Sequence, residues 1–173
     1  MRHCDVYLAV MFQDKSVQII EATVEHYEEI GNLVGSPEEL YLVYPSGSYP
    51  WDVAQLKKLA ELRPNFTVSI VQNEIAAFAN LYNVLPGESA FIGNVIVSEK
   101  HKGKGIGKAL TMHMVKICQE QYKAVPHLSV FGFNARAILM YSSLGFVPYE
   151  VEARKNLNSE IVALIHMRYE QKT

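Results

Sequence analysis

The sequence has few cysteines, no long hydrophobic run and no strong excess of either charge. Its two cysteines, Cys4 and Cys118, lie far apart without a CxxC pair, which argues against a disulfide framework or a zinc knuckle and favours reduced thiols. The longest apolar run near the N-terminus, residues 6–12, is too short to span a bilayer, and no small-residue cleavage site follows it. We therefore expect a cytoplasmic protein with no membrane partner.

The overall composition is that of a globular chain. It has 173 residues, of which 49% are hydrophobic and 20% are charged, with a formal net charge of -2. This balance gives no global reason to expect nucleic acid as a partner. Because the sequence contains no repeat, linker or low-complexity segment, we expect residues 1–173 to form a single domain, with residues 1–15 as an extra N-terminal arm or strand.

The hydrophobic periodicity alternates between that of strands and that of helices. It predicts a short strand over residues 17–22, helices over 23–33 and 36–44 that are capped by Thr23 and Ser36, and a helix over 52–62. Three strands follow over 66–71, 75–84 and 90–97, and then a helix over 106–122, a strand near 128–130, a helix over 135–144 that is capped by Asn134, and strands over 147–153 and 161–167. This order indicates an α/β domain with a mixed sheet.

Residues 95–110 combine an apolar strand, a glycine-rich turn and the start of a helix. The strand contributes Val95, Ile96 and Val97, and the turn contains Lys102, Gly103, Lys104, Gly105, Ile106, Gly107 and Lys108. Glycines let the backbone approach a ligand closely, and the first N–H groups of a helix have no partner within the helix. The positive end of the helix dipole lies at the same place. This stretch therefore predicts a site for a phosphorylated ligand.

Spacing rejects the nucleotide-binding templates. A Walker A loop that ended at Gly107-Lys108 would need glycine where Lys102 stands and serine or threonine where Ala109 stands. The GxGxxG pattern of dinucleotide-binding folds and kinases would need its last glycine at Lys108 or Leu110. Neither template fits.

Residues 102–107 instead resemble the phosphate loop of the GNAT superfamily of acetyl-CoA-dependent N-acetyltransferases, with Lys102 at the place of the usual Arg or Gln. A second segment resembles the Asn…Ala…Tyr…Gly-Phe pattern of the same superfamily, in Asn134, Ala135, Ala137, Tyr141, Gly145 and Phe146. The resemblance is specific over roughly residues 90–147. It implies the family's fold, of α+β type, with a mixed, mostly antiparallel sheet of about seven strands flanked by helices.

The resemblance also implies a reaction. An amine attacks the thioester carbonyl of acetyl-CoA directly, the glycine turn holds the phosphates, and backbone groups near residues 95–97 hold the pantetheine and polarise the carbonyl. Asn134 and Ala137 lie on the donor side, and Tyr141 matches the general acid that protonates the leaving thiolate. Seven residues separate Asn134 from Tyr141, about 10.5 Å along one helix face. The expected acceptor is a primary amine of a small molecule or of a peptide.

The general base and the acceptor pocket are less clearly encoded. Relatives carry a glutamate where this chain has Gly93 or Ser129, so we expect Glu88 to act as the base through a water molecule. Tyr49, Trp51 and Tyr82 are candidates for acceptor contacts. The aromatic loop over residues 44–51 has two interpretations, since it either forms a pocket wall or is pinned to the core. The six histidines include no HExxH or other metal-binding pair, so no metal is expected.

Two other functions stay open at this stage. Without a carboxylate at positions 93 and 129, the chain would also suit an acetyl-CoA-binding sensor or interaction module with little turnover. Nucleic-acid binding through the lysines of residues 100–108 is weakly supported, because the cluster is short and no basic excess surrounds it. The sequence does not give the oligomeric state, and a homodimer remains an open expectation.

Overall fold

One mixed sheet runs through the computed structural model, which describes residues 10–12 and 15–171. The strand order is β1-β2-β3-β4-β5-β6-β8-β7, and every neighbouring pair is antiparallel except β5 and β6, which are parallel. The strands are β1 Val10–Phe12, β2 Lys15–Glu21, β3 Thr67–Val71, β4 Glu74–Leu85, β5 Ser89–Val97, β6 Val125–Phe131, β7 Phe146–Lys155 and β8 Ile161–Tyr169. The predicted fold class is confirmed.

The sheet has eight strands in the described residues, not about seven, because residues 10–12 of the predicted N-terminal arm pair with β2. The rest of that arm, residues 1–9 and 13–14, lies outside the described residues. The helices are α1 Tyr27–Gly31, α2 Pro37–Val43, α3 Val53–Leu62, α4 Ile106–Gln121 and α5 Ala135–Leu144. The helix predicted over 23–33 is a 3₁₀ turn, Val24–His26, continued by α1.

Local capping chemistry sets the starts of three helices. The side chains of Ser36, Asp52 and Asn134 accept hydrogen bonds from the backbone N–H groups of Glu39, Gln55 and Ala137, at 3.1, 2.9 and 3.2 Å. Each bond satisfies an N–H group that the helix itself leaves unpaired. The caps at Ser36 and Asn134 were predicted from the sequence, because a cap depends only on residues that are neighbours along the chain, whereas Asp52 was expected inside its helix and is instead the cap.

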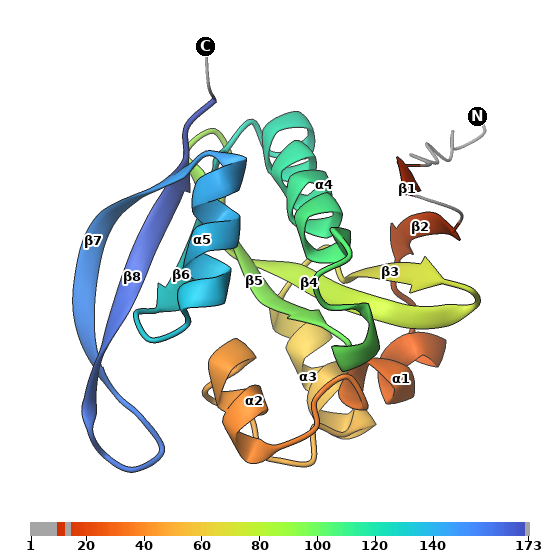
Figure 1. Cartoon of the computed structure of the whole chain (residues 1–173). Helices are drawn as coiled ribbons and strands as arrows, with labels where there is room; N and C mark the ends of the chain where they lie inside the picture. The colour runs from red at the N-terminus through yellow and green to blue at the C-terminus, as the bar shows by residue number, and fades with distance from the viewer. Residues whose placement is uncertain (1–9, 13–14, 172–173) are drawn as a thin grey trace.

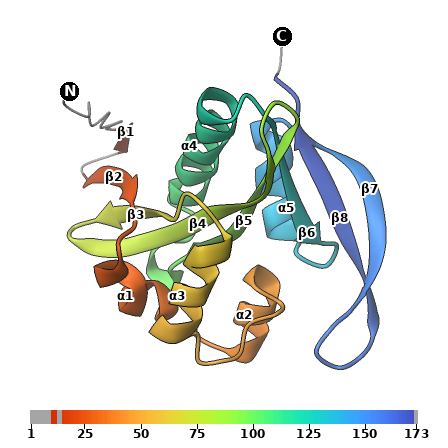
Figure 2. The same cartoon turned by 180° about the vertical axis from the view of Figure 1, so that it is seen from behind.

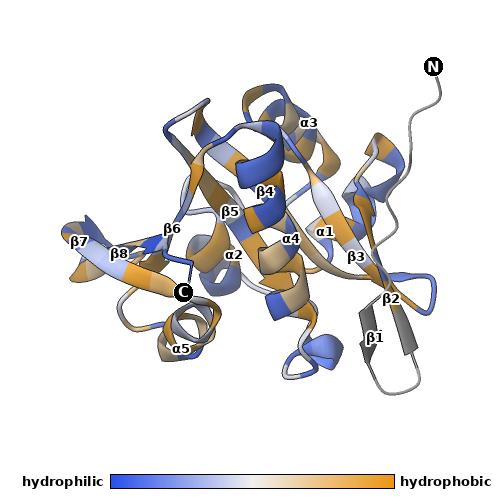
Figure 3. Ribbon diagram, turned by 90° about the horizontal axis from the view of Figure 1, so that it is seen from above, coloured by the Kyte–Doolittle hydropathy of each residue, from blue (hydrophilic) through white to orange (hydrophobic). Residues whose placement is uncertain are grey.

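The helices cover both faces of the sheet. Helices α4 and α5 lie on one face and α1 and α3 on the other, as the two opposite views show (Figures 1 and 2). Leu110 and Met114 of α4 are fully buried against the sheet, and Leu56 of α3 is fully buried on the opposite side. The hydropathy colouring follows this arrangement, with hydrophobic colour along the central strands β4 and β5 (Figure 3). Among the helices of the described residues, none combines the length and apolar character needed to cross a membrane.

Strands β5 and β6 pair over only part of their length. Their register runs from Ser89 opposite Val125 to Ile92 opposite Leu128 and stops there. Beyond that point the two strands separate, and α2 lies below the opening (Figures 1 and 2). A bulge in β5 falls just past the last pair, where Asn94 has a left-handed backbone with φ of 50°. The separation leaves the β6-facing backbone edge of the second half of β5 without a strand partner.

The aromatic loop between α2 and α3 has both roles: residues 44–46 line a cavity, whereas its end at Trp51 is pinned to the core. Only 2% of Trp51 is exposed, and its ring meets Phe78 edge-on at 6.0 Å and Tyr44 at 5.9 Å between centroids. Tyr49 is partly exposed and donates its hydroxyl to the carbonyl of Gly35 at 3.1 Å. Of the two interpretations of this loop, core pinning is the correct one for Trp51, because its indole is enclosed by other side chains.

A Trp51→Ala substitution tests this placement. Deleting a buried indole leaves a cavity and should lower the free energy of unfolding by about 3–5 kcal/mol. Leu62→Ala removes a side chain that is 79% exposed, so it should change stability by no more than about 0.5 kcal/mol. Urea unfolding of both variants measures the difference. Equal stability of the two would contradict the buried position of Trp51.

Candidate active site

The glycine turn forms a set of backbone donors at the start of α4. Gly103 and Gly105 have φ of 79° and 80°, a left-handed conformation that side chains rarely adopt. The first helical bond at this end runs from the Ala109 N–H to the Gly105 carbonyl at 3.0 Å, so the N–H groups before it have no helical partner. A Cβ on Gly107 would lie 3.1 Å from the Val97 side chain, and this close approach seats α4 against β5.

Two lysines of the turn have polar partners within the protein. Lys102 donates to Glu99 and lies 3.6 Å from Glu39. Lys104 donates to the carbonyl of Lys100, and Lys108 is exposed. Sequence reasoning missed Arg136 of α5, whose guanidinium lies 3.5 Å from where a Cβ on Gly103 would stand. The signal for Arg136 that the sequence offered was its position two residues after Asn134, the cap of α5.

Two cavities meet in the opening between β5 and β6. The smaller, about 230 Å³, extends toward the glycine turn and includes Lys102, Arg136 and Met140 in its lining. The larger, about 600 Å³, extends toward β8 and the end of α2. Both are lined by Leu42, Val43, Val95, Asn134, Ala137 and Tyr141. A molecule in one cavity can therefore contact a molecule in the other at this junction.

Tyr141 stands at the junction with 7% of its surface exposed. Burial, and next the nearby Tyr82 phenol, raise the pKa of Tyr141 well above its ordinary value. The phenol thus keeps its proton throughout the neutral range. Its ring packs edge-on against Phe146 at 5.9 Å, which fixes its position.

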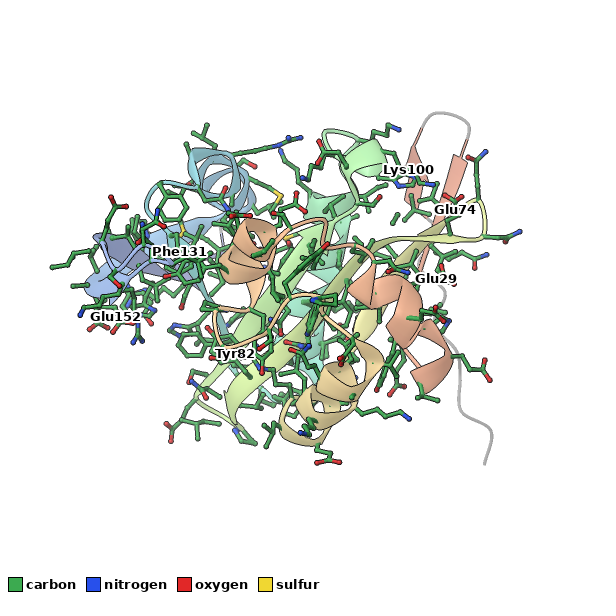
Figure 4. The ribbon with its side chains drawn as sticks, turned by 90° about the horizontal axis from the view of Figure 1, so that it is seen from below. Glu29, Glu74, Tyr82, Lys100, Phe131 and Glu152 are labelled. Carbon is green, nitrogen blue, oxygen red and sulfur yellow. The ribbon has the colours of Figure 1, made fainter. Side chains whose placement is uncertain are left out.

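A chain of four polar side chains begins in the wall of the larger cavity, which Tyr82, Ser129 and His166 line, and ends at Glu152 behind His166. The hydroxyl of Tyr82 lies 3.3 Å from that of Ser129, which lies 2.8 Å from Nδ1 of His166. On the other side of the imidazole, Nε2 is 3.4 Å from a carboxylate oxygen of Glu152. The tautomer with its proton on Nε2 would place that proton toward this carboxylate and leave Nδ1 to accept from the Ser129 hydroxyl. Tyr82 and Glu152 lie on the same side of the molecule, away from Lys100 and Glu74 (Figure 4).

An arginine occupies the wall of the larger cavity. Arg63, the residue after α3, donates to Oδ1 of Asn94 at 2.8 Å, and its guanidinium lies 4.6 Å from the centre of the Tyr82 ring. Burial lowers the pKa of Arg63, and the Tyr82 and Tyr44 phenols oppose this change. Gly93 makes the arrangement fit, since a Cβ there would lie 2.9 Å from Nη1 of Arg63.

Aromatic residues enclose the mouth of the larger cavity. Tyr41 stacks on Phe131 with 4.9 Å between ring centres, and its hydroxyl donates to the carbonyl of Lys155 at 2.6 Å. This bond ties α2 to the hairpin of β7 and β8. The cavity therefore lies between the helix, the hairpin and the separated strands.

The structure brings some of the predicted site residues together and leaves others apart. Tyr82 and Tyr141 line the larger cavity, but Tyr49 and Trp51 do not. Glu88 lies exposed in the turn between β4 and β5 and is not part of either lining, so the geometry does not suit it as a base.

Of the predicted residues around the glycine turn, some line a cavity and others do not. Val97 and Ile96 line the smaller cavity. Ile106 is 3% exposed and packs in the core, so only its backbone can face a ligand.

The described residues contain no cluster of three His, Cys, Asp or Glu side chains able to hold a metal ion. Burial raises the pKa of the Cys118 thiol to about 12, which makes this cysteine a poor nucleophile. Cys4 lies outside the described residues.

A glycine turn whose N–H groups have no helical partner, next to a gap between separated strands, suits a ligand with phosphate groups and an extended arm, as CoA has. The family model described as "Acetyltransferase (GNAT) family" matches residues 27–146. The [ribosomal protein bS18]-alanine N-acetyltransferase of Escherichia coli K12 is 30% identical over 122 residues, 69% of this chain and 78% of that protein. The chain belongs to the GNAT family of acetyltransferases, and acetyl-CoA is its co-substrate.

Solved structures show the same fold. Protein smu.2055 of Streptococcus mutans UA159 superposes with a TM-score of 0.73 at 20% identity, over 88% of this chain and 98% of that one. The putative acetyltransferase yncA of Salmonella typhimurium, solved with acetyl-CoA, gives 0.70 at 16% identity, over 89% and 93%.

A pair of glycine substitutions tests whether the turn holds the donor. Gly105→Ala should weaken CoA binding about tenfold, because a side chain disfavours the left-handed backbone that aims the N–H groups. Gly87→Ala is the control, since Gly87 has φ of 82° in the β4–β5 turn with open space around it. Both variants should lose about 1 kcal/mol of stability. Calorimetric titration with CoA should detect weaker binding only for Gly105→Ala, and an equal effect in both would count against the site.

Proposed function

We propose that the chain transfers the acetyl group of acetyl-CoA to a primary amine bound in the larger cavity. The observation that carries this proposal is the position of Tyr141, where the two cavities meet. The E. coli relative is named for acetylation of an alanine of a ribosomal protein. A peptide amino group or a small amine therefore forms the acceptor class.

The smaller cavity suits the donor. The N–H groups of the glycine turn and the guanidinium of Arg136 hold its phosphates, since both are strong donors to phosphate oxygens. The unpaired edge of β5 at Val95 and Val97 binds the amides of the pantetheine arm. The Oδ1 of Asn134 caps α5, which leaves its amide Nδ2 to donate. Bound in this way, acetyl-CoA supplies a thioester at the junction.

Tyr141 acts as the general acid. Its phenol donates a proton to the sulfur as the C–S bond breaks, so the leaving group departs as a thiol. The raised pKa keeps the phenol protonated until this step. Backbone N–H groups of the separated β5 edge face the carbonyl oxygen and stabilise the charge that develops there.

The four-residue chain from Tyr82 to Glu152 receives the proton of the acceptor. The ammonium group gives a proton to the Tyr82 oxygen, the Tyr82 proton moves to Ser129, and the Ser129 proton moves to Nδ1 of His166. The imidazolium that results faces the carboxylate of Glu152, which stabilises it. Other groups near His166 are the Tyr149 ring at 6.2 Å, His127, and Arg154, which pairs with Glu152.

This route replaces Glu88 as the proposed base. It also answers the argument for a sensor with little turnover, which depended on the missing carboxylate at Gly93 and Ser129. Ser129 has an imidazole and a carboxylate behind it, so proton removal does not need an acid at that position. The homodimer and the cytoplasmic location stay expectations beside this proposal.

Thiol release in the presence of acetyl-CoA and a panel of amines and N-terminal peptides tests the function. The protein should turn over at least one amine, and Tyr141→Phe should lower kcat about 10²- to 10⁴-fold because the thiolate must leave unprotonated. Tyr169→Phe is the control: its ring also packs against Phe146, at 5.4 Å, but does not line either cavity.

Two results would oppose this assignment. Absence of CoA binding at millimolar concentration would remove the transferase function altogether. Unchanged turnover in Tyr141→Phe would remove only the general acid.

A His166→Gln substitution tests the proton route. Near pH 7 it should lower kcat about 100-fold or more, because the ammonium must then lose its proton unaided. The deficit should shrink above about pH 10, where amines are already neutral. His127→Gln changes a histidine that does not line the cavity itself and packs behind the lining residue Phe91, with 4.9 Å between ring centres, so this variant should keep wild-type turnover. A deficit that is the same at every pH would indicate a structural role for His166.

A further inference from the structure

The charged residues of the larger cavity have one sign. Arg63, Arg154 and Lys155 contribute to its lining, and no Asp or Glu is among its lining residues. Arg154 pairs with Glu152 at 2.6 Å, and the Lys155 backbone is held by Tyr41 at the mouth. Arg63 lies deeper, against Tyr82 and Asn94. The acceptor cavity is therefore cationic, which is unexpected for a site that receives an ammonium group.

Arg63 has no anionic partner among the described residues. Its guanidinium has five N–H donors, and one of them is used by Oδ1 of Asn94. Its flat face rests on the Tyr82 ring at 4.6 Å and the Tyr44 ring at 5.5 Å. Within the described ranges, no carboxylate lies within ion-pair distance of it. A partly desolvated cation without a counter-charge is costly and attracts an anion.

The surroundings hold Arg63 in place. Asn94 is 4% exposed, accepts from both Arg63 and Asn80, and donates to the Val43 carbonyl at 2.6 Å. Gly93 leaves the space that the guanidinium and the Tyr82 ring fill. A rotamer fixed by a buried amide and two aromatic rings is preorganised for a ligand.

We propose that Arg63 binds a carboxylate of the acceptor, so that the substrate is an amine carrying a carboxylate a few bonds away. This inference rests on the proposed acetyl transfer. The Tyr82 ring lies between the Arg63 guanidinium and the Tyr82 hydroxyl, which receives the proton. One acceptor therefore places its carboxylate at the guanidinium and its amine at the hydroxyl. An amino acid meets this description, and so does a peptide whose N-terminus is next to an acidic side chain.

The same geometry disfavours polyamines. Position 93 is a glycine with the Arg63 guanidinium beside it, so the charge at this place in the cavity is positive. A second ammonium group on the acceptor would meet Arg63, and like charges in a partly buried site repel strongly.

Matched acceptor pairs test the inference. Thiol release is measured with amino acids and their amides, with N-terminal peptides that differ by Glu or Gln at the second residue, and with spermidine. We expect kcat/KM to favour the carboxylate form about 10- to 100-fold in one of the two sets, which identifies the source of the carboxylate. Arg63→Met should abolish this preference through KM, and Arg63→Lys should restore part of it.

Arg168→Met is the control, because Arg168 pairs with Glu170 at 2.9 Å and does not line the cavity. CoA affinity should be the same in all variants. A second readout needs no turnover: carboxylate-bearing amines should raise the melting temperature of the protein–CoA complex, and Arg63→Met should remove this rise.

Amides accepted as well as acids, or an Arg63→Met effect equal for both, would overturn the inference while leaving acetyl transfer intact. Failure of every amine in thiol release would instead count against the proposed function, and the melting experiment would still decide the role of Arg63.

Discussion

The early end of the β5–β6 ladder is the constraint on which the site depends. Pairing stops at Ile92 and Leu128, and from there the two strands diverge. Because the strands diverge, backbone groups of β5 are exposed and Tyr141 of α5 reaches the opening. The same divergence leaves space for two cavities that meet. The bulge at Asn94 lies at this point and turns β5 away from its neighbour. A site for two reactants thus follows from a few missing strand hydrogen bonds.

Asn94 connects this backbone irregularity to the electrostatics of the acceptor cavity. Its left-handed backbone aims a buried amide at three groups at once: the Arg63 guanidinium, the Asn80 amide and the Val43 carbonyl. The amide therefore sets the position of the cation and anchors the end of α2 that borders both cavities. One side chain therefore links the local fold to the cation that we propose selects the acceptor.

The sequence predicted the features that depend on neighbours along the chain. The caps at Ser36 and Asn134 are local hydrogen bonds, and the strand–turn–helix of the phosphate loop is encoded within residues 95–110. It could not predict contacts that the tertiary fold creates. His166 reaches Ser129 only because β8 inserts between β6 and β7, and Arg63 meets Gly93 across thirty residues of chain. Trp51 was ambiguous because an aromatic residue in a loop packs equally well in a core or in a pocket wall.

The chain separates two tasks that one glutamate at position 93 or 129 could perform together. Such a carboxylate would attract an ammonium group and also take its proton. In the mechanism that we propose, the proton leaves toward His166 and Glu152, while Arg63 attracts the opposite charge. A cation near the acceptor amine lowers the pKa of that amine, and this favours the neutral form that attacks. In an amino acid the neighbouring carboxylate stabilises the ammonium form. By pairing with that carboxylate, Arg63 cancels this stabilisation, so the contact that binds the acceptor also helps to deprotonate it.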